Sequence, residues 1–316
     1  MRPLCPTHIY KLTVLGLGLL SLLLFGCVQQ EQSHAEQQRP KQQSPKQLEA
    51  AWPQKLKIGL VPEQNIFVQK KRYEPLLAQL EDKIGIPIEI KILPSYSEVV
   101  NNFRDFELDG AFLGSFTGTM AIRELGVEPL VRPQFMDNSA TCSAIVFAKK
   151  GDGIRAARDM RGKRIAFVDK ASSTGFLLPL AYFKSLGIED YQNWFGDVLF
   201  SGTHEDAIND VLSGYADVGA VSSTIFYMLA EMNPQVLNEL TVLGTSPLIP
   251  SNPLSVRNDL PEDLKQLLKQ QLLTLHQSAA GRAILDNLKV KQFTEASKED
   301  SQPLLDLISP AHHQSS

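Results

Sequence analysis

The sequence predicts an α/β fold of two lobes separated by a cleft, and three observations support this prediction. From Lys55 onward, short β-rich runs alternate with stretches of helical periodicity, a pattern typical of βαβ units in largely parallel sheets. Gly151 and Gly153 interrupt this series, which then starts again. A stretch from Pro247 to Pro253 follows the second series and leads into a further helix. By analogy with two-lobed proteins, we expect the chain to return there and complete the first lobe.

The first series contains four predicted strands and three predicted helices. Its helix at residues 73–84, for example, places Leu76, Leu77, Leu80 and Ile84 on one face. The predicted strands are 57–61, 86–93 and 110–113, and the predicted helices are 73–84, 96–106 and 117–125. A strand at 143–148 ends this series, so that residues 53–148 form the first lobe.

The second series begins with a strand at 164–168 and ends near residue 246. The other predicted strands are 198–200, 217–221 and 241–243, and the predicted helices are 174–186, 205–212 and 224–232. Pro261 suits the first turn of the amphipathic helix that follows. We therefore expect residues 149–246 to form the second lobe and about 247–316 to complete the first.

The amino terminus has the features of an export signal. Arg2 and Lys11 precede the apolar run 12–25, which is shorter than the roughly 20 residues of a membrane-spanning helix. The run ends in Leu-Phe-Gly-Cys at Cys27, which resembles the lipobox of bacterial lipoproteins. This resemblance implies cleavage after residue 26 and lipid attachment to Cys27, whereas a plain signal peptide with an incidental cysteine is the alternative. The Gln-rich stretch 27–52 is predicted to be a flexible tether.

Composition excludes several classes of function. The 316 residues include 31 Lys plus Arg against 35 Asp plus Glu, so no basic excess is present for binding nucleic acid. The three cysteines form no CxxC pair, and the six histidines form no cluster, so neither a metal site nor a cofactor is expected. The sequence contains no GxxxxGK[ST], GxSxG or HExxH motif, and we do not expect an enzyme.

The strongest local signal is the hydroxyl-rich segment VDKASSTG at 168–175. It follows a predicted strand and opens a predicted helix, where free N–H groups and the helix dipole favour an anion. Three neighbouring hydroxyls can donate further hydrogen bonds without adding a fixed charge. The alternative is that Ser172 or Ser173 serves only as a helix N-cap.

A wider set of motifs resembles the phosphate/phosphite/phosphonate-binding proteins of ABC importers. The segment VDKASSTGFLLP at 168–179 is similar to the (F)xDPxSTSGxLxP segment of that family. Further similar segments, in the order the family requires, are YSEV at 96–99, DGAFLGS at 109–115, DMRGK at 159–163, SGTH at 201–204, GYADVGAV at 214–221 and RNDLP at 257–261. The resemblance covers about residues 55–275.

The resemblance implies a two-lobed periplasmic-binding-protein fold (type II-like) whose lobes close over a phosphorus oxyanion. It also implies that a permease of the inner membrane, driven by an ATPase, receives the ligand. By position in the family motifs, the ligand-binding residues are expected to be Ser172, Ser173, Thr174, Gly175, Tyr96 and His204. Tyr96 could instead be a half-buried tyrosine at a helix start, and a lone histidine such as His204 is often structural.

Two departures from the family pattern bear on the ligand. Ser222 stands where family members that bind an amino group commonly carry Asp, although Glu205 or Asp206 could substitute. Ser115 stands in place of a proline and adds a hydroxyl on the first lobe, so we include it among the ligand-binding residues. Both changes favour a small oxyanion such as phosphite or phosphate, or a short alkylphosphonate, over an aminoalkylphosphonate. Cys142 could suit an arsenic oxyanion, but a small buried residue is the simpler interpretation.

The sequence thus predicts a lipid-anchored binding protein of an ABC importer on the periplasmic side of a bacterial cell envelope. Val28 does not reveal which membrane holds the anchor. The alternative is a sensor or accessory lipoprotein that uses the same clamp and signals to a membrane kinase or an envelope partner.

Overall fold

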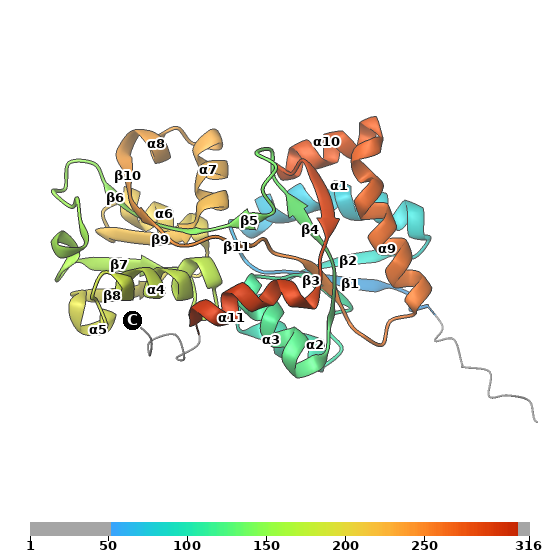
Figure 1. The fold of residues 1–316 in the computed structure, drawn as a ribbon. Helices are drawn as coiled ribbons and strands as arrows, with labels where there is room; N and C mark the ends of the chain where they lie inside the picture. Colours follow the sequence, from blue (N-terminus) through green and yellow to red (C-terminus); the bar gives the residue numbers. More distant parts are fainter. Residues whose placement is uncertain (1–51, 309–316) are drawn as a thin grey trace, which may run out of the picture. The chain divides into compact units, whose positions relative to one another are not determined.

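The computed structural model of the protein describes residues 52–308, which form two sheets joined by a pair of short strands (Figure 1). We call the six-stranded sheet with its helices lobe 1, and the five-stranded sheet with its helices lobe 2. The predicted signal peptide, Cys27 and the tether up to residue 51 lie outside the described residues.

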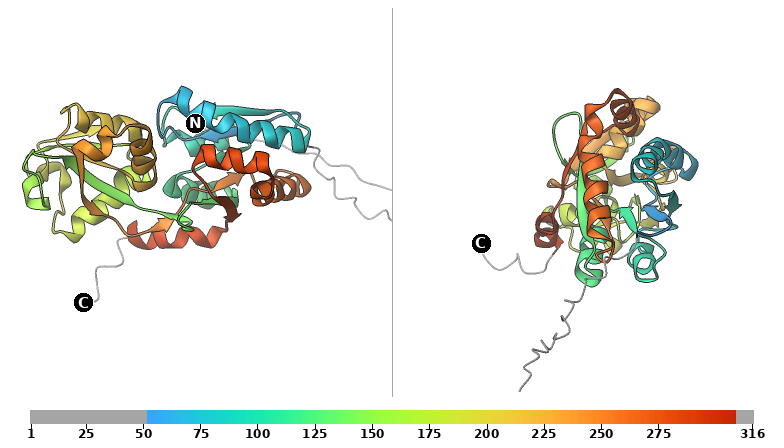
Figure 2. Two further views of the ribbon diagram at one scale, coloured as in Figure 1. Left: turned by 90° about the horizontal axis from the view of Figure 1, so that it is seen from above. Right: turned by 90° about the vertical axis from the view of Figure 1, so that its right-hand side faces the viewer.

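Lobe 1 contains a mixed sheet with the strand order β13-β4-β12-β3-β1-β2. β1 is parallel to β2 and β3, whereas β12 is antiparallel to β3 and β4, and β13 is antiparallel to β4. The strands are β1 (Leu56–Leu60), β2 (Ile88–Ile92), β3 (Gly110–Phe112), β4 (Glu128–Gln134), β12 (Leu254–Val256) and β13 (Gln292–Glu295). The helices are α1 (Ile66–Ile84), α2 (Glu98–Arg104), α3 (Ser115–Leu125), α9 (Glu262–Thr274), η3 (Leu275–Gln277) and α10 (Ala279–Leu288). α1 packs against α9 and α10 (Figure 2).

Lobe 2 contains a sheet with the strand order β10-β6-β9-β7-β8. β7 is parallel to β8 and β9, and β6 is antiparallel to β9 and β10. The strands are β6 (Ala144–Lys149), β7 (Arg164–Phe167), β8 (Asp197–Phe200), β9 (Val218–Ser222) and β10 (Leu240–Thr245). The helices are η1 (Ala157–Met160), η2 (Ser173–Leu177), α4 (Leu178–Ser185), α5 (Tyr191–Trp194), α6 (His204–Leu212), α7 (Ser223–Met232) and α8 (Gln235–Glu239).

Two antiparallel strands carry the chain between the lobes. β5 (Thr141–Cys142) leads into lobe 2, and β11 (Ile249–Pro250) leads back, with Ile249 paired to Cys142. After β13 and η4 (Lys298–Ser301), the helix α11 (Gln302–Ile308) packs against α4 and β11. Leu304 of α11 is buried beside Cys142 and Ile249, so this helix covers the crossover strands.

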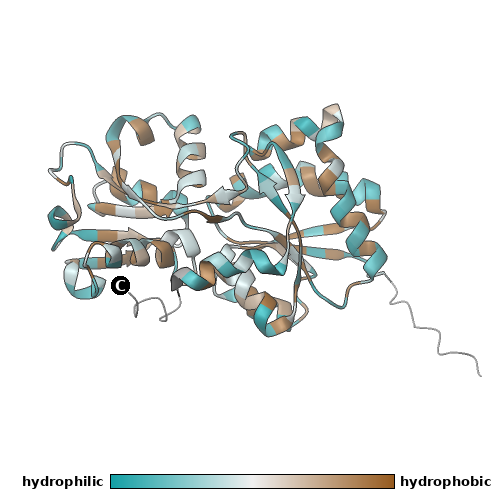
Figure 3. Ribbon diagram, in the orientation of Figure 1, coloured by the Kyte–Doolittle hydropathy of each residue, from teal (hydrophilic) through white to brown (hydrophobic). Residues whose placement is uncertain are grey.

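Apolar side chains concentrate on the strands of both sheets (Figure 3). One buried cluster lies between the lobe 1 sheet and the helices α1, α9 and α10, and a second lies within lobe 2 around Phe167. Phe167 has no exposed surface and contacts the rings of Phe176, Phe183, Tyr191 and Phe200. Such burial of apolar surface is the main force that stabilises each lobe.

Most of the predicted strands and helices are confirmed, and α1 differs in where it begins. It starts at Ile66 rather than Tyr73, because the Asn65 side chain caps it by accepting hydrogen bonds from the N–H groups of Phe67 and Val68. Its first turn is exposed, with Phe67 77% accessible, so no apolar periodicity marks it in the sequence.

β4 was not expected at all, because its sequence EPLVRPQ contains Pro129 and Pro133. Its pairing with β12 is irregular next to Pro129, where the register shifts between Leu254 and Ser255. The irregular ladder accommodates a residue that has no N–H to donate.

Within residues 52–308, no helix combines the length and the apolar composition that a membrane span requires.

Candidate functional site

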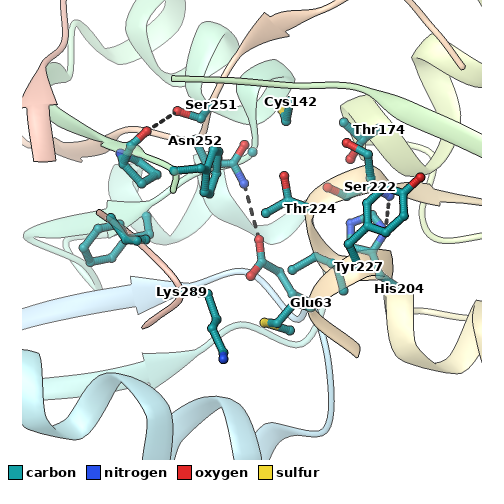
Figure 4. A pocket seen from close by; sticks show the side chains of 18 of the residues that line it. Glu63, Cys142, Thr174, His204, Ser222, Thr224, Tyr227, Ser251, Asn252 and Lys289 are labelled. Atoms are coloured by element: carbon teal, nitrogen blue, oxygen red, sulfur yellow. Dashed lines mark hydrogen bonds between the residues drawn. The ribbon is translucent and has the colours of Figure 1, made fainter. Parts of the chain in front are cut away.

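The cavity at the centre of the candidate site has a volume of about 590 Å³ and is lined by residues of both lobes and of the crossover strands. Figure 4 shows one part of its wall, where Thr174, His204 and Ser222 lie on lobe 2. Four helical N-termini contribute to this wall, with Gly114 before α3, Ser173 at the start of η2, His204 at the start of α6 and Ser223 at the start of α7. The N–H groups of His204 and Ser223 already donate to the carbonyls of Glu63 and Ser143, but the dipoles of these helices still favour negative charge, so this part of the cavity is suited to an anion.

The turn at η2 is a single π-helical turn rather than the regular helix expected over 174–186, which begins as α4 only at Leu178. The Ser172 hydroxyl accepts a hydrogen bond from the N–H of Gly175 at 3.0 Å, so Ser172 is the N-cap. Ser172 can be both the N-cap and a ligand-binding residue, because a hydroxyl oxygen that accepts this bond still has a proton to donate. Ser173 and Thr174 are 4% and 8% exposed and line the cavity.

His204 is held as a neutral donor. Its Nδ1 accepts a hydrogen bond from the N–H of Ser222 at 3.1 Å, so the ring proton is carried by Nε2. The side chain is 2% exposed, and burial lowers its pKa to about 3. At neutral pH this imidazole therefore offers an Nε2–H group to an anion without carrying a positive charge.

Tyr96 precedes α2 in lobe 1, and its ring meets that of His204 edge to face at 6.3 Å. It is 2% exposed, and its hydroxyl has no hydrogen-bond partner among the described residues. Burial, and then the nearby Glu63 and Asp169, raise the pKa of this phenol well above its usual value, whereas the neighbouring Ser172 side chain lowers it. A buried, protonated and unpartnered hydroxyl is available to donate to a ligand.

The lobes also contact each other directly. The N–H of Phe116 in α3 donates to the Ser173 hydroxyl at 2.7 Å, and the N–H of His204 donates to the Glu63 carbonyl at 3.0 Å. The Glu205 carboxylate accepts from the N–H of Asn65 at 2.7 Å. These bonds connect residues on opposite sides of the cavity, so the structure describes a closed arrangement of the two lobes.

The structure brings together most of the predicted site residues. The cavity is lined by Tyr96, Ser172, Ser173, Thr174 and His204. Gly175 lies behind this wall, where its N–H bonds to Ser172 and its carbonyl accepts from the N–H of Val168. Ser115 does not line the cavity, because its hydroxyl turns away to donate to the carbonyl of Pro250 at 3.0 Å. The expectation that Ser115 contacts the ligand is therefore corrected: it connects α3 to the crossover strand β11.

Several lining residues were not predicted from the sequence. Glu63, Arg72 and Tyr73 come from the loop after β1 and from α1, and Asn252 follows β11. No motif marks these four residues, and only the fold brings them into the same cavity as Ser173, Thr174 and His204. Cys142 also lines the cavity; burial raises the pKa of its thiol to about 12, so the thiol is neutral. Within residues 52–308, no three His, Cys, Asp or Glu side chains are grouped closely enough to hold a metal ion.

Comparisons with known proteins identify the family to which the chain belongs. Residues 58–301 match the family described as "ABC transporter, phosphonate, periplasmic substrate-binding protein". The phosphonates-binding periplasmic protein of Escherichia coli (strain K12) is 22% identical over 80% of this chain and 75% of its own length. A probable ABC transporter phosphite binding protein, PhnD1 of Prochlorococcus marinus, is 25% identical over 77% of this chain and 85% of its own length.

Solved structures show the same fold. A binding protein component of an ABC phosphonate transporter from Pseudomonas aeruginosa superposes with a TM-score of 0.76 at 21% identity, covering 80% of this chain and 85% of that one. PhnD1 of Prochlorococcus marinus in complex with methylphosphonate gives a TM-score of 0.74 at 22% identity, covering 81% and 97%. Both likenesses support the two-lobed fold predicted from the sequence. With the match over residues 58–301, they identify the chain as a member of the family of periplasmic substrate-binding proteins of phosphonate ABC transporters.

Proposed function

We propose that the protein captures a phosphorus compound by its oxyanion and delivers it to an ABC permease. The observation that supports this proposal best is the convergence of neutral donors on one wall of the cavity. The hydroxyls of Ser173 and Thr174 at the η2 turn, the Nε2–H of His204 and the hydroxyl of Tyr96 can all supply hydrogen bonds without a fixed positive charge. Hydrogen bonds to a charged ligand contribute about 1.5–3 kcal/mol each, so a few suffice for micromolar affinity.

The ligand-binding residues in this proposal are Tyr96, Ser172, Ser173, Thr174 and His204, with Gly175 shaping the turn. The lobe boundary expected after residue 148 lies earlier, because β6 pairs with β9 and β10 of lobe 2. The residues between β5 and β11 would act as one lobe and the residues before β5 and after β11 as the other, moving about the β5–β11 pair. A ligand held by Tyr96 from lobe 1 and Thr174 from lobe 2 favours the closed state by its extra affinity for it.

Titration calorimetry tests this function. The purified protein, unfolded and refolded to remove carried-over ligand, is titrated with phosphate, phosphite and methylphosphonate, with sulfate as the control anion. We expect tight binding of at least one phosphorus anion and a loss of roughly 10- to 100-fold in Thr174→Ala, because one hydrogen bond to the anion is removed.

The matched control is Ser185→Ala, which removes an exposed hydroxyl from α4, the helix that continues η2. Its affinity should equal that of the wild type. Binding of none of the phosphorus anions, or equal losses in both variants, would contradict the proposal.

We also propose that a lipid on Cys27 holds the protein on the outer side of a membrane, with 28–52 as a tether. Burial of acyl chains contributes about 0.8 kcal/mol per CH₂, so several chains give stable attachment.

In cell fractionation, we expect the wild type in the membrane pellet and Cys27→Ala in the soluble or secreted fraction. A Cys5→Ala variant, which changes a cysteine within the signal, should stay with the membrane. Equal membrane association of Cys27→Ala would exclude the anchor.

A further inference from the structure

The cavity is larger than an inorganic phosphorus oxyanion requires. Its volume of about 590 Å³ lies in the middle of the range of roughly 300–1,000 Å³ that holds drug-sized ligands. A phosphate or phosphite ion has at most five non-hydrogen atoms. With such an ion at the helix N-termini, most of the cavity would remain for a substituent on phosphorus.

One wall of this remaining space is aromatic. Tyr73 of α1, Phe112 of β3 and Phe293 of β13 line the cavity from lobe 1. The ring centroids of Tyr73 and Phe112 are 5.3 Å apart, and those of Phe112 and Phe293 are 6.3 Å apart, so the three rings form one packed group. Aromatic faces of this kind bind apolar groups, and their electron-rich faces also attract cations.

The same side of the cavity presents the carboxylate of Glu63. The Glu63 carbonyl is bonded to the N–H of His204, and in Figure 4 the Glu63 side chain points toward Asn252, with Thr174 and Ser222 on the other side of the cavity. Glu63 Oε1 accepts a hydrogen bond from Asn252 Nδ2 at 3.3 Å. Among the described residues, no lysine, arginine or histidine forms an ion pair with this carboxylate.

Neither Arg72 nor Lys289, the arginine and lysine that line the cavity, forms an ion pair with Glu63. Arg72 attracts Glu63 electrostatically, but its Nη1 donates to Gln64 Oε1 at 3.5 Å and contacts the sulfur of Met228, and its Nε is buried without a hydrogen-bond partner among the described residues. Lys289 pairs with Glu231 at 2.8 Å. A carboxylate removed from water without a paired cation is energetically costly, and burial accordingly raises the pKa of Glu63. A cationic group on the ligand would offset this cost.

We propose that the ligand is an organophosphorus anion with a large apolar substituent that ends in a positively charged nitrogen paired with Glu63. This inference rests on the proposed function, because it assumes that the oxyanion occupies the helix N-termini. The aromatic wall then contacts the apolar body of the substituent, and Glu63 determines specificity for its cationic end.

A series of three phosphonates tests the proposal by titration calorimetry on the protein purified after its processing in the cell. The ligands are methylphosphonate, benzylphosphonate and 4-(aminomethyl)benzylphosphonate. We expect benzylphosphonate to bind about tenfold or more tightly than methylphosphonate, because its ring is buried against the aromatic wall. The ammonium group of 4-(aminomethyl)benzylphosphonate should raise the affinity roughly tenfold above that of benzylphosphonate. Equal affinities for all three would overturn this inference and leave the proposed function standing, whereas binding of none would overturn both.

Two variants then test the role of Glu63. Glu63→Gln keeps an oxygen that can accept from Asn252 but removes the charge, so the preference for the ammonium ligand over benzylphosphonate should fall from about tenfold to near one. Asp137→Asn removes another carboxylate that lines the cavity, one exposed and hydrogen-bonded to Ser139, and should keep the full preference. A preference retained in Glu63→Gln would overturn the assignment.

A neutral ligand supplies a test that does not depend on folding of the variant. We expect 4-ethylbenzylphosphonate, which replaces the ammonium with a methyl group, to bind wild-type protein roughly tenfold more weakly than the ammonium ligand. Equal or tighter binding of the neutral ligand would overturn the proposal.

Discussion

Gly175→Ala is expected to weaken binding of the phosphorus anion by roughly 100-fold or more, because it displaces the turn that carries several donors at once. A Cβ at this position would lie 2.4 Å from the Cβ of Val168 and 2.9 Å from the Ser172 hydroxyl. Val168 Cβ is fixed to the backbone at the end of β7, so either the strand end or the η2 turn must move. Strain of this kind also lowers the free energy of unfolding by about 1–3 kcal/mol.

Calorimetry and urea denaturation measure the two effects separately. The matched control is Gly118→Ala in α3, where the added Cβ would meet Leu113 at 3.4 Å and the helix gains a residue of higher propensity. Binding by this control should stay at the wild-type level. If Gly175→Ala also binds the anion at wild-type affinity, the η2 turn does not position the donors.

The part of the cavity wall formed by Ser172, Ser173 and Thr174 was predictable because its signal is local. Ser172, Ser173 and Thr174 are consecutive, and the strand before them and the helix after them are visible as changes of periodicity. N-capping chemistry and the helix dipole act within one turn, so a short segment contains the information. The π-helical form of the turn was not predictable, since it depends on how Gly175 packs against Val168.

The opposite side of the cavity could not be predicted from the residues alone. Glu63 is separated by 189 positions from Asn252, the residue whose amide donates to it. Neither residue stands in a motif, and only the pairing of β5 with β11 brings the segment after β11 to the cavity. Ser115 shows the converse case, because a hydroxyl at a motif position was assigned to the ligand, whereas in the structure it donates to the carbonyl of Pro250.

The α/β units themselves followed from periodicity because burial imposes it. β9, whose residues are all buried, and α6, whose buried residues include Ala207, Ile208 and Val211, carry clear patterns and are confirmed. The first turn of α1 and the proline-containing β4 carry no such pattern. Their structure is determined by a side-chain cap and by strands distant in the sequence.

His204 makes the stability of the protein depend on pH in a predictable direction. Its pKa is lowered by burial from 6.5 to about 3, so between these values the unfolded chain binds a proton that the folded chain does not. The free energy of unfolding should therefore fall as the pH is lowered from 6.5, by about 1.4 kcal/mol per pH unit. Above pH 6.5 the histidine is neutral in both the folded and the unfolded state, so it does not contribute to the pH dependence of the free energy of unfolding.

Urea denaturation between pH 7 and pH 4.5 measures this dependence, and His204→Gln isolates the part due to the imidazole. The glutamine amide oxygen can still accept from the N–H of Ser222, so the fold keeps that bond. Glu63 acts in the opposite direction, since its raised pKa makes the folded chain bind a proton more readily and so adds stability as the pH falls. The contribution of Glu63 is common to both proteins and cancels in their difference. We expect wild type to lose about 2–3 kcal/mol more than His204→Gln across this range. Parallel pH curves would mean that His204 becomes protonated in the folded state as easily as in water, and that it is not the neutral donor the cavity requires.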